Sequence, residues 1–169
     1  IWDKKEGFLV NFGYTYYKSL ELKDVSILSF DIETTGLSPH ASDAKVLLIS
    51  NTYRKGDKII KRLFAFDEYH SQIAMLEDWS QWVREMNPSI LCGHNIISFD
   101  LFYMNAIARA EDGYLNLGRD NSPLEFAKYE SKFRKDQTQF LSYKKPKVFG
   151  REVIDTYFLS IKYDIVQKK

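Results

Sequence analysis

Short apolar runs separated by turn residues divide the chain into the elements of an α/β protein. VSILSFD (25–31) has the length and composition of a buried central strand, and SILCGHN (89–95) is a second one. KVLLISNTYR (45–54) and KIIKRLFAF (58–66) flank the turn sequence KGD, which predicts a hairpin. The aromatic segment GFLVNFGYTYY (7–17) predicts one or two strands before the main sheet.

Two segments have apolar residues three or four positions apart, which is the spacing of a helix packed on a core. In 71–86 the apolar positions are Ile73, Leu76, Trp79, Val83 and Met86. Asn87 and Pro88 should end this helix, because the residue before a proline disfavours helical geometry. The second helix is expected at 98–110, with Ser98 as its N-cap.

The last part of the chain predicts one more strand and helix after an insertion. The polar, aromatic and basic segment 114–147 is expected to form a β-hairpin and a loop, followed by a strand at 148–155 and a helix at 156–169. Strands that alternate with helices in this order predict an α/β fold, a sheet of mixed direction with flanking helices.

Length and composition are those of one compact domain. The chain has 169 residues, of which 44% are hydrophobic, enough to build a core. Cys92 is the single cysteine, so neither an internal disulfide nor a cysteine zinc cluster can form. The sequence shows no signal-peptide pattern and no apolar run of membrane-spanning length. We therefore expect an intracellular, cytoplasmic protein without a membrane partner.

Charge is unevenly distributed along the chain. Residues 1–127 carry 13 Lys and Arg against 18 Asp and Glu, whereas residues 128–169 carry 11 against 5. Basic side chains alternate with aromatic ones between 132 and 147, a composition that suits single-stranded DNA. A solvated surface loop has the same composition, so this segment alone does not establish nucleic-acid binding.

Asp31 and Glu33 are the first candidates for chemistry. They stand two residues apart at the end of a predicted buried strand, so their side chains leave the strand on the same face. Two carboxylates on one face repel each other unless a cation lies between them or one binds a proton. For an isolated D-x-E sequence, an Asp that caps the following loop and a solvated Glu are the simpler interpretation.

A second segment strengthens the metal interpretation. GHNIISFDLFYM (93–104) leads from a strand end through Asn95 into a helix that carries Asp100. If this strand and the strand 25–31 are parallel neighbours, both turns lie at the edge of the sheet where α/β proteins bind ligands. Asp100 would then point toward Asp31 and Glu33, and three carboxylates in one cleft call for a divalent cation.

The two motifs together resemble a known enzyme family. DIETTGL (31–37) and GHNIISFD (93–100) resemble the first and second exonuclease motifs of the DEDD 3′→5′ exonucleases, the second in its family B DNA polymerase form. The segments YYKSLELKDVSILSFDIETTGL, LGRD and VFGREVIDTYFLSIKYD also look like parts of that polymerase family's editing domain. The resemblance implies a ribonuclease H-like fold with a five-stranded mixed sheet, flanking helices and an inserted hairpin.

Roles for individual residues follow from this resemblance. Asp31, Glu33 and Asp100 would be the catalytic residues and would bind two Mg²⁺ or Mn²⁺ ions. Helical spacing, rather than the resemblance, divides the aromatic residues of the second predicted helix: we expect Phe99 and Tyr103 near the cleft and Phe102 in the core. The residues expected to contact the 3′ end of single-stranded DNA are Thr34, Leu37, Asn95, Phe99 and Tyr103.

The chain departs from the family in one respect. The fourth carboxylate of the family comes from a Y-x-x-x-D motif on a late helix, but Tyr157 is followed by Ile161 and Asp164 is preceded by Ser160 at that spacing. Asp155 is expected to cap the closing helix instead. We therefore expect residues 1–169 to be one exonuclease domain that stops before the third motif, with weak activity or none. Within it, 1–24 would be a strand lead-in and 114–147 an insertion.

The leading hypothesis is a proofreading 3′→5′ exonuclease domain that works beside a polymerase domain in DNA replication, as a monomer. One alternative is a stand-alone DEDD exonuclease that acts on RNA or DNA. Another is a non-catalytic nucleic-acid-binding module, which cleft carboxylates disfavour because they repel a phosphate backbone.

Overall fold

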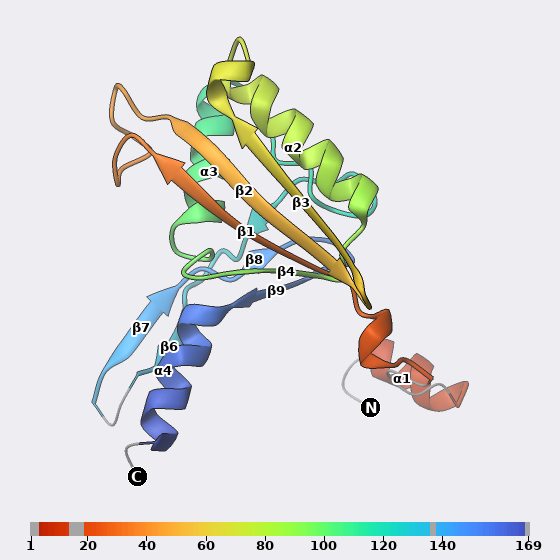
Figure 1. Cartoon of the computed structure of the whole chain (residues 1–169). Helices are drawn as coiled ribbons and strands as arrows, with labels where there is room; N and C mark the ends of the chain where they lie inside the picture. The colour runs from red at the N-terminus through yellow and green to blue at the C-terminus, as the bar shows by residue number, and fades with distance from the viewer. Residues whose placement is uncertain (1–3, 14–18, 136–137, 168–169) are drawn as a thin grey trace.

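The computed structural model describes residues 4–13, 19–135 and 138–167 (Figure 1). The main sheet contains the strands β1 (Ile27–Thr34), β2 (Val46–Lys55), β3 (Lys58–Ala65), β4 (Ile90–Gly93) and β9 (Glu152–Asp155). The helices are α1 (Lys4–Asn11), η1 (Leu22–Asp24), η2 (Phe66–Glu68), α2 (Gln72–Met86), α3 (Asp100–Ala110) and α4 (Thr156–Gln167). Short strands between α3 and β9 are β5 (Glu125–Phe126), β6 (Ser131–Arg134), β7 (Phe140–Tyr143) and β8 (Pro146–Lys147).

The central sheet is mixed, as predicted. Its five strands run in the order β3-β2-β1-β4-β9. β1 is antiparallel to β2, whereas β4 is parallel to both β1 and β9. The parallel pairing of β1 with β4 aligns Ile27 with Ile90 and Ser29 with Cys92, so the two strands end at the same edge of the sheet. This edge is where the two sequence motifs were expected to meet.

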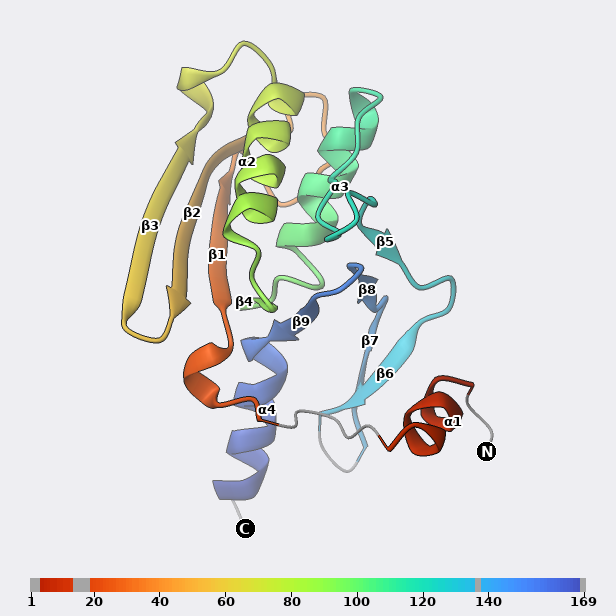
Figure 2. The same cartoon turned by 90° about the vertical axis from the view of Figure 1, so that its right-hand side faces the viewer.

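The helices α2 and α3 lie against the same face of the sheet (Figure 2). Along β1 the buried residues Leu28, Phe30 and Ile32 alternate with the exposed Ser29, Asp31 and Glu33. Period-two alternation therefore directs the apolar side chains of β1 toward the helices and its carboxylates toward the opposite face. Trp79 and Trp82 of α2 are buried in the core, and the helical spacing of apolar residues predicted this for Trp79.

The boundaries of α2 follow the sequence signals. The Ser71 hydroxyl accepts a hydrogen bond from the Ala74 N–H at 3.2 Å, an N-cap contact. Asn87 adopts a left-handed conformation with φ of 46° directly after the helix, ahead of Pro88. The predicted β2–β3 hairpin is also confirmed, and Gly56 lies in its turn with φ of 55°.

Three predicted elements differ from the structure. Residues 4–11 form the helix α1 instead of strands, so the strand lead-in predicted within 1–24 is wrong there, and 14–18 lies outside the described residues. Phe8 and Phe12, one helical turn apart, contact each other with ring centroids 4.6 Å apart. β-propensity depends on neighbouring strands, and within the described residues this segment pairs with none.

The other two differences concern element starts. α3 begins at Asp100 with Phe99 at the N-cap position and no side-chain cap, so Ser98 does not cap it. The last strand is shorter than 148–155, because Phe149 and Gly150 form a turn closed by a bridge between Val148 and Arg151. Gly150 has φ of 72°, and a Cβ there would lie 2.8 Å from Cδ of Arg119.

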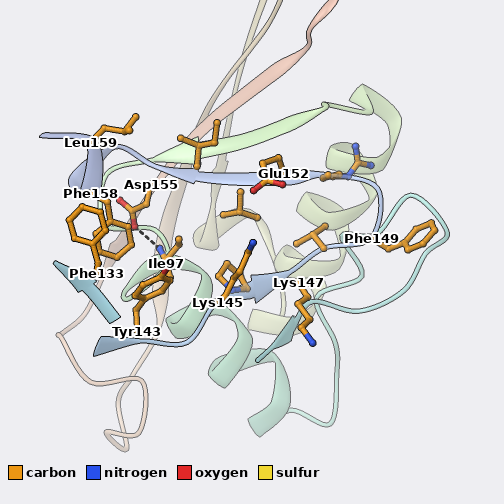
Figure 3. Close-up of a pocket in the computed structure, with 15 residues that line it drawn as sticks. Ile97, Phe133, Tyr143, Lys145, Lys147, Phe149, Glu152, Asp155, Phe158 and Leu159 are labelled. Carbon is orange, nitrogen blue, oxygen red and sulfur yellow. Dashed lines mark hydrogen bonds between the residues drawn. The ribbon is translucent and has the colours of Figure 1, made fainter. Parts of the chain in front are cut away.

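The insertion contains the predicted hairpin, formed by β6 and β7 (Figure 1). Phe133 of β6 stacks on Phe158 of α4 with ring centroids 4.8 Å apart, and Tyr143 of β7 packs on the same ring at 4.9 Å. These contacts hold the hairpin beside α4, which directly follows β9. Between them lies a groove of about 600 Å³ (Figure 3).

Candidate active site

Asp31 and Glu33 project from the end of β1 on the face opposite to α2 and α3. Both side chains are exposed, while Ile32 between them is buried. Asp31 is aligned with Ser50 of β2, whose hydroxyl donates to the Asp31 carbonyl at 3.4 Å. The prediction that the two carboxylates share one face is therefore confirmed. Both are accessible to a ligand, which a role in the core would not allow.

The turn between β4 and α3 brings the second motif to the same edge. Gly93 ends β4, and a Cβ at this position would lie 2.3 Å from Cγ2 of Ile96 and 2.5 Å from the Phe30 carbonyl oxygen. Only glycine allows so close an approach of the turn to β1. Asn95 follows with φ of 64°, a conformation that Asn adopts more readily than most residues.

Asp100, at the start of α3, is the buried member of the group. Its side chain is only 2% exposed, and Oδ1 accepts a hydrogen bond from the Ile32 N–H at 3.1 Å. The carboxylate therefore contacts β1 at the residue between Asp31 and Glu33. Burial, followed by the negative charge of Asp31, raises the pKa of Asp100 to about 7. Two segments 68 residues apart thus meet in one acidic site.

Asp155, at the end of β9, is a further buried carboxylate beside this turn. It is 4% exposed and accepts hydrogen bonds from the N–H groups of Asn95, Ile97 and Tyr157, at 2.8, 3.0 and 2.9 Å. The bond from Tyr157, in the first turn of α4, confirms the predicted helix cap. The two bonds to the β4–α3 turn were not predicted, because the sequence does not show that β9 lies beside β4.

The donor chemistry of this site suits a hard divalent cation. Such ions bind oxygen ligands, and a buried carboxylate next to a second one lacks a compensating positive charge. Asp100 meets this description, and its raised pKa reflects the cost of ionisation there. Throughout the described part of the chain, however, no three His, Cys, Asp or Glu side chains are grouped closely enough to hold a metal ion. The acidic site is therefore incomplete as a ready-made metal centre.

The residues predicted to contact substrate lie in different surroundings. Thr34 is half-buried and its hydroxyl donates to the Gly36 carbonyl at 2.8 Å, within the turn after β1. Leu37 in the same turn is 87% exposed. Phe99 is half-buried and packs against Tyr103 with ring centroids 5.5 Å apart. Thr34 thus ends the strand of Asp31 and Leu37 lies in the turn after it, while Asn95 and Phe99 flank the turn before Asp100.

The burial of Tyr103 and the exposure of Phe102 are the reverse of what was predicted. Tyr103 is fully buried, so it does not line the cleft, whereas Phe102 is 44% exposed. The face of α3 that packs on the core carries Leu101, Met104 and Ala108, which places position 103 inward and position 102 outward. The apolar spacing of these three residues was the sequence signal that identifies the buried face.

Comparisons with known proteins agree with this architecture. The family described as "DNA polymerase family B, exonuclease domain" matches residues 13–164. The DNA polymerase delta catalytic subunit of Drosophila melanogaster is 36% identical over 95 residues, 46% of this chain and 9% of that protein. Its counterpart from Plasmodium falciparum is 28% identical over 180 aligned positions, 90% of this chain and 16% of that protein. The chain thus spans a small part of these relatives.

A solved structure shares the fold. The family B DNA polymerase from the hyperthermophilic archaeon Pyrobaculum calidifontis matches 79% of this chain and 15% of its own, with a TM-score of 0.57 and 19% identity. Together with the five-stranded mixed sheet, this confirms the predicted ribonuclease H-like α/β fold. Within the described residues, none of the helices is long and apolar enough to cross a membrane. From the match over residues 13–164, the chain belongs to the family of exonuclease domains of family B DNA polymerases.

Proposed function

We propose that this chain is a metal-dependent 3′→5′ exonuclease domain that removes nucleotides from the 3′ end of single-stranded DNA. The proposal rests mainly on the position of Asp100. Its buried carboxylate accepts a hydrogen bond from the backbone N–H between Asp31 and Glu33, and burial, followed by the charge of Asp31, raises its pKa. Ionised carboxylates placed this close together are unfavourable without a positive charge. Their arrangement therefore favours a role in which a bound cation compensates their negative charge.

The residues that would hold two Mg²⁺ or Mn²⁺ ions are Asp31, Glu33 and Asp100. When bound, such ions lower the pKa of a water molecule and stabilise the negative charge on the departing oxygen. The chain itself contributes orientation: the hydrogen bond from the Ile32 N–H fixes one oxygen of Asp100, and Asp31 and Glu33 face solvent, where a phosphodiester can approach. We assign no residue to the fourth carboxylate, and we expect weak activity for this reason.

The partners follow from the proposed reaction. The curated relatives are catalytic subunits of DNA polymerase delta, and the chain matches 9% to 16% of their length. We propose that the domain edits DNA ends beside a polymerase domain inside the cell. Thr34, Leu37, Asn95 and Phe99 would receive the 3′ end, because they border the two turns that carry the acidic residues.

A cleavage assay tests this function. The chain is incubated with single-stranded DNA labelled at its 5′ end, in Mg²⁺ or Mn²⁺, and the products are resolved by length. We expect stepwise shortening from the 3′ end, and we expect Asp31→Ala to abolish it. Glu77→Ala is the matched control, since it removes an exposed carboxylate of α2, on the opposite side of the sheet.

Other outcomes would replace the proposal. Shortening of labelled RNA but not DNA would favour a stand-alone ribonuclease. Retention of DNA in a binding assay without shortening in Mn²⁺ would favour a non-catalytic binding module, the function that fits the absence of a three-residue metal cluster in the described residues. Activity that survives Asp31→Ala would place the reaction elsewhere.

A further inference from the structure

Asp155 makes more contacts than a helix cap requires. Oδ1 accepts hydrogen bonds from the N–H groups of Asn95 and Tyr157, and Oδ2 accepts one from Ile97. Figure 3 shows its side chain directed toward Ile97, with this last bond drawn as a dashed line. Two of the three donors belong to the β4–α3 turn, about sixty residues earlier in the chain. One buried carboxylate therefore joins the β4–α3 turn to the junction of β9 and α4 at the edge of the sheet.

We infer that Asp155 is a positioning residue for the acidic site: by holding the turn at Asn95 and Ile97, it fixes the start of α3 and hence the carboxylate of Asp100. This inference rests on the proposed nuclease function for its purpose, but the positioning itself is a structural claim. Asp155 contacts neither Asp31 nor Glu33 by any hydrogen bond that the described residues show, so it acts through the turn.

Backbone hydrogen bonds connect the turn to Asp100. The carbonyl of Asn95 accepts from the Phe99 N–H at 2.9 Å, and the carbonyl of Ile96 accepts from the Leu101 N–H at 2.9 Å. These two donors are the residues on either side of Asp100. A change in the orientation of the turn therefore moves both neighbours of Asp100, and with them its hydrogen bond to Ile32.

Within the described residues, the side chains of the turn give it little support of their own, apart from His94, whose Nδ1 lies 3.4 Å from the Thr156 hydroxyl oxygen. α3 starts without a side-chain N-cap, and Asn95 holds a left-handed conformation. Among the described residues, the side chain that accepts hydrogen bonds from the N–H groups of Asn95 and Ile97 is that of Asp155. These contacts therefore set the orientation of the turn before α3.

Two substitutions separate the cap from the positioning role. Asp155→Asn keeps one acceptor oxygen but replaces the other with an amide NH₂ group, which cannot accept, so either the bond from the Ile97 N–H or those from the Asn95 and Tyr157 N–H groups are lost. Asp155→Ser keeps a preferred N-cap residue for α4, but its side chain is too short to reach Asn95 and Ile97. The matched control is Thr156→Val, which removes a different hydrogen bond of the same junction, from its hydroxyl to the Gly93 carbonyl at 2.9 Å.

The first measurement is independent of nuclease activity. Amide hydrogen exchange is followed by NMR at Ile32, whose N–H donates to Asp100 and which lies on β1. We expect exchange at Ile32 to rise about tenfold or more in both Asp155 variants and to stay unchanged in Thr156→Val. If exchange rises only at Tyr157 and in α4, Asp155 is a helix cap and the inference is wrong. Should Asp155→Asn not fold, Asp155→Ser decides.

The second measurement uses manganese. Mn²⁺ titrated into the folded chain should bind about tenfold or more weakly to the two Asp155 variants than to the wild type, the usual effect of removing a group that orients a metal ligand. Equal affinity would contradict positioning. If the wild type itself binds no Mn²⁺, the proposed function fails, while the Ile32 exchange result still decides whether Asp155 positions Asp100.

Discussion

At the scale of single residues, burial determines what each carboxylate contributes. Asp31 and Glu33 are exposed to solvent, whereas Asp100 is buried against Ile32. Its pKa of about 7 lies above the ordinary value of 3.8, mainly because burial disfavours the charged form. Near neutral pH, Asp100 is therefore poised between a protonated form that stabilises the fold and an ionised form that can bind a cation.

Replacement of Asp100 by Asn tests this pKa through stability. A carboxyl with a raised pKa in the folded state stabilises the protein below its unfolded pKa and loses that contribution as pH rises through about 7. Asn keeps the acceptor for Ile32 but has no charge. Without divalent ions, we expect the wild type to lose on the order of 2 kcal/mol relative to Asp100→Asn between pH 5 and pH 8, as about 1.4 kcal/mol corresponds to one pKa unit.

Urea unfolding of both proteins at several pH values measures the difference. A stability difference that does not depend on pH would mean that Asp100 titrates normally. Addition of Mn²⁺ at pH 8 should stabilise the wild type but not the Asn variant, since bound ligand stabilises the folded state and the ligand carboxylate must be ionised.

The sequence indicated most of these residues but not all of their surroundings. Asp31 and Glu33 were placed correctly by the two-residue period of a strand, and Asp100 by its position after a strand end. The burial of Tyr103 was missed because the prediction did not use the apolar spacing of Leu101, Met104 and Ala108, which identifies the buried face of α3. The contacts of Asp155 with the turn depend on β9 lying next to β4, which is tertiary information.

At the scale of elements, hydrophobic periodicity and turn residues predicted those helices and strands that local sequence determines. The hairpin β2–β3 and the helix α2 were found because KGD marks a turn and apolar residues recur every three or four positions. The helix α1 was missed because aromatic residues are common in strands but join a sheet only where a partner strand exists. The shorter β9 reflects the Phe149–Gly150 turn, which packs against Arg119 from a distant loop.

Phe158 connects two such elements, the hairpin β6–β7 and α4. Its ring contacts Phe133 and Tyr143, which lie on the two strands of the hairpin. Because Phe158 is half-buried, we expect Phe158→Ala to reduce the free energy of unfolding by about 1–3 kcal/mol, less than the loss for a fully buried ring. The hairpin should also become more accessible to proteases.

Urea unfolding and limited proteolysis measure the two effects. Phe149→Ala is the control, because Phe149 lines the same groove but is 63% exposed. Equal stability and equal cleavage in the two variants would show that the aromatic contacts of Phe158 do not hold the hairpin.

At the scale of the whole molecule, charge separates along the chain. Residues 1–127 have 5 more acidic than basic residues, and residues 128–169 have 6 more basic than acidic ones. Asp31, Glu33 and Asp100 belong to the acidic part, whereas Lys145 and Lys147 line the groove beside β9 and α4 (Figure 3). A DNA strand is repelled by the acidic site in the absence of cations, so its affinity should come from the basic part.

Salt dependence of binding tests this division. Each phosphate neutralised in single-stranded DNA contributes about −0.7 to the slope of log K against log salt. If both groove lysines contact phosphates, replacement of Lys145 and Lys147 by Gln should make the slope shallower by about 1.4 and weaken binding at low salt. The control replaces Lys55 and Lys58, two exposed lysines of the β2–β3 hairpin, in the same way. Fluorescence anisotropy of a labelled oligonucleotide in EDTA, from about 50 to about 200 mM salt, gives the slopes. Equal slopes for the two double variants would mean that the groove lysines are solvated surface residues and that single-stranded DNA reaches the acidic site by another route.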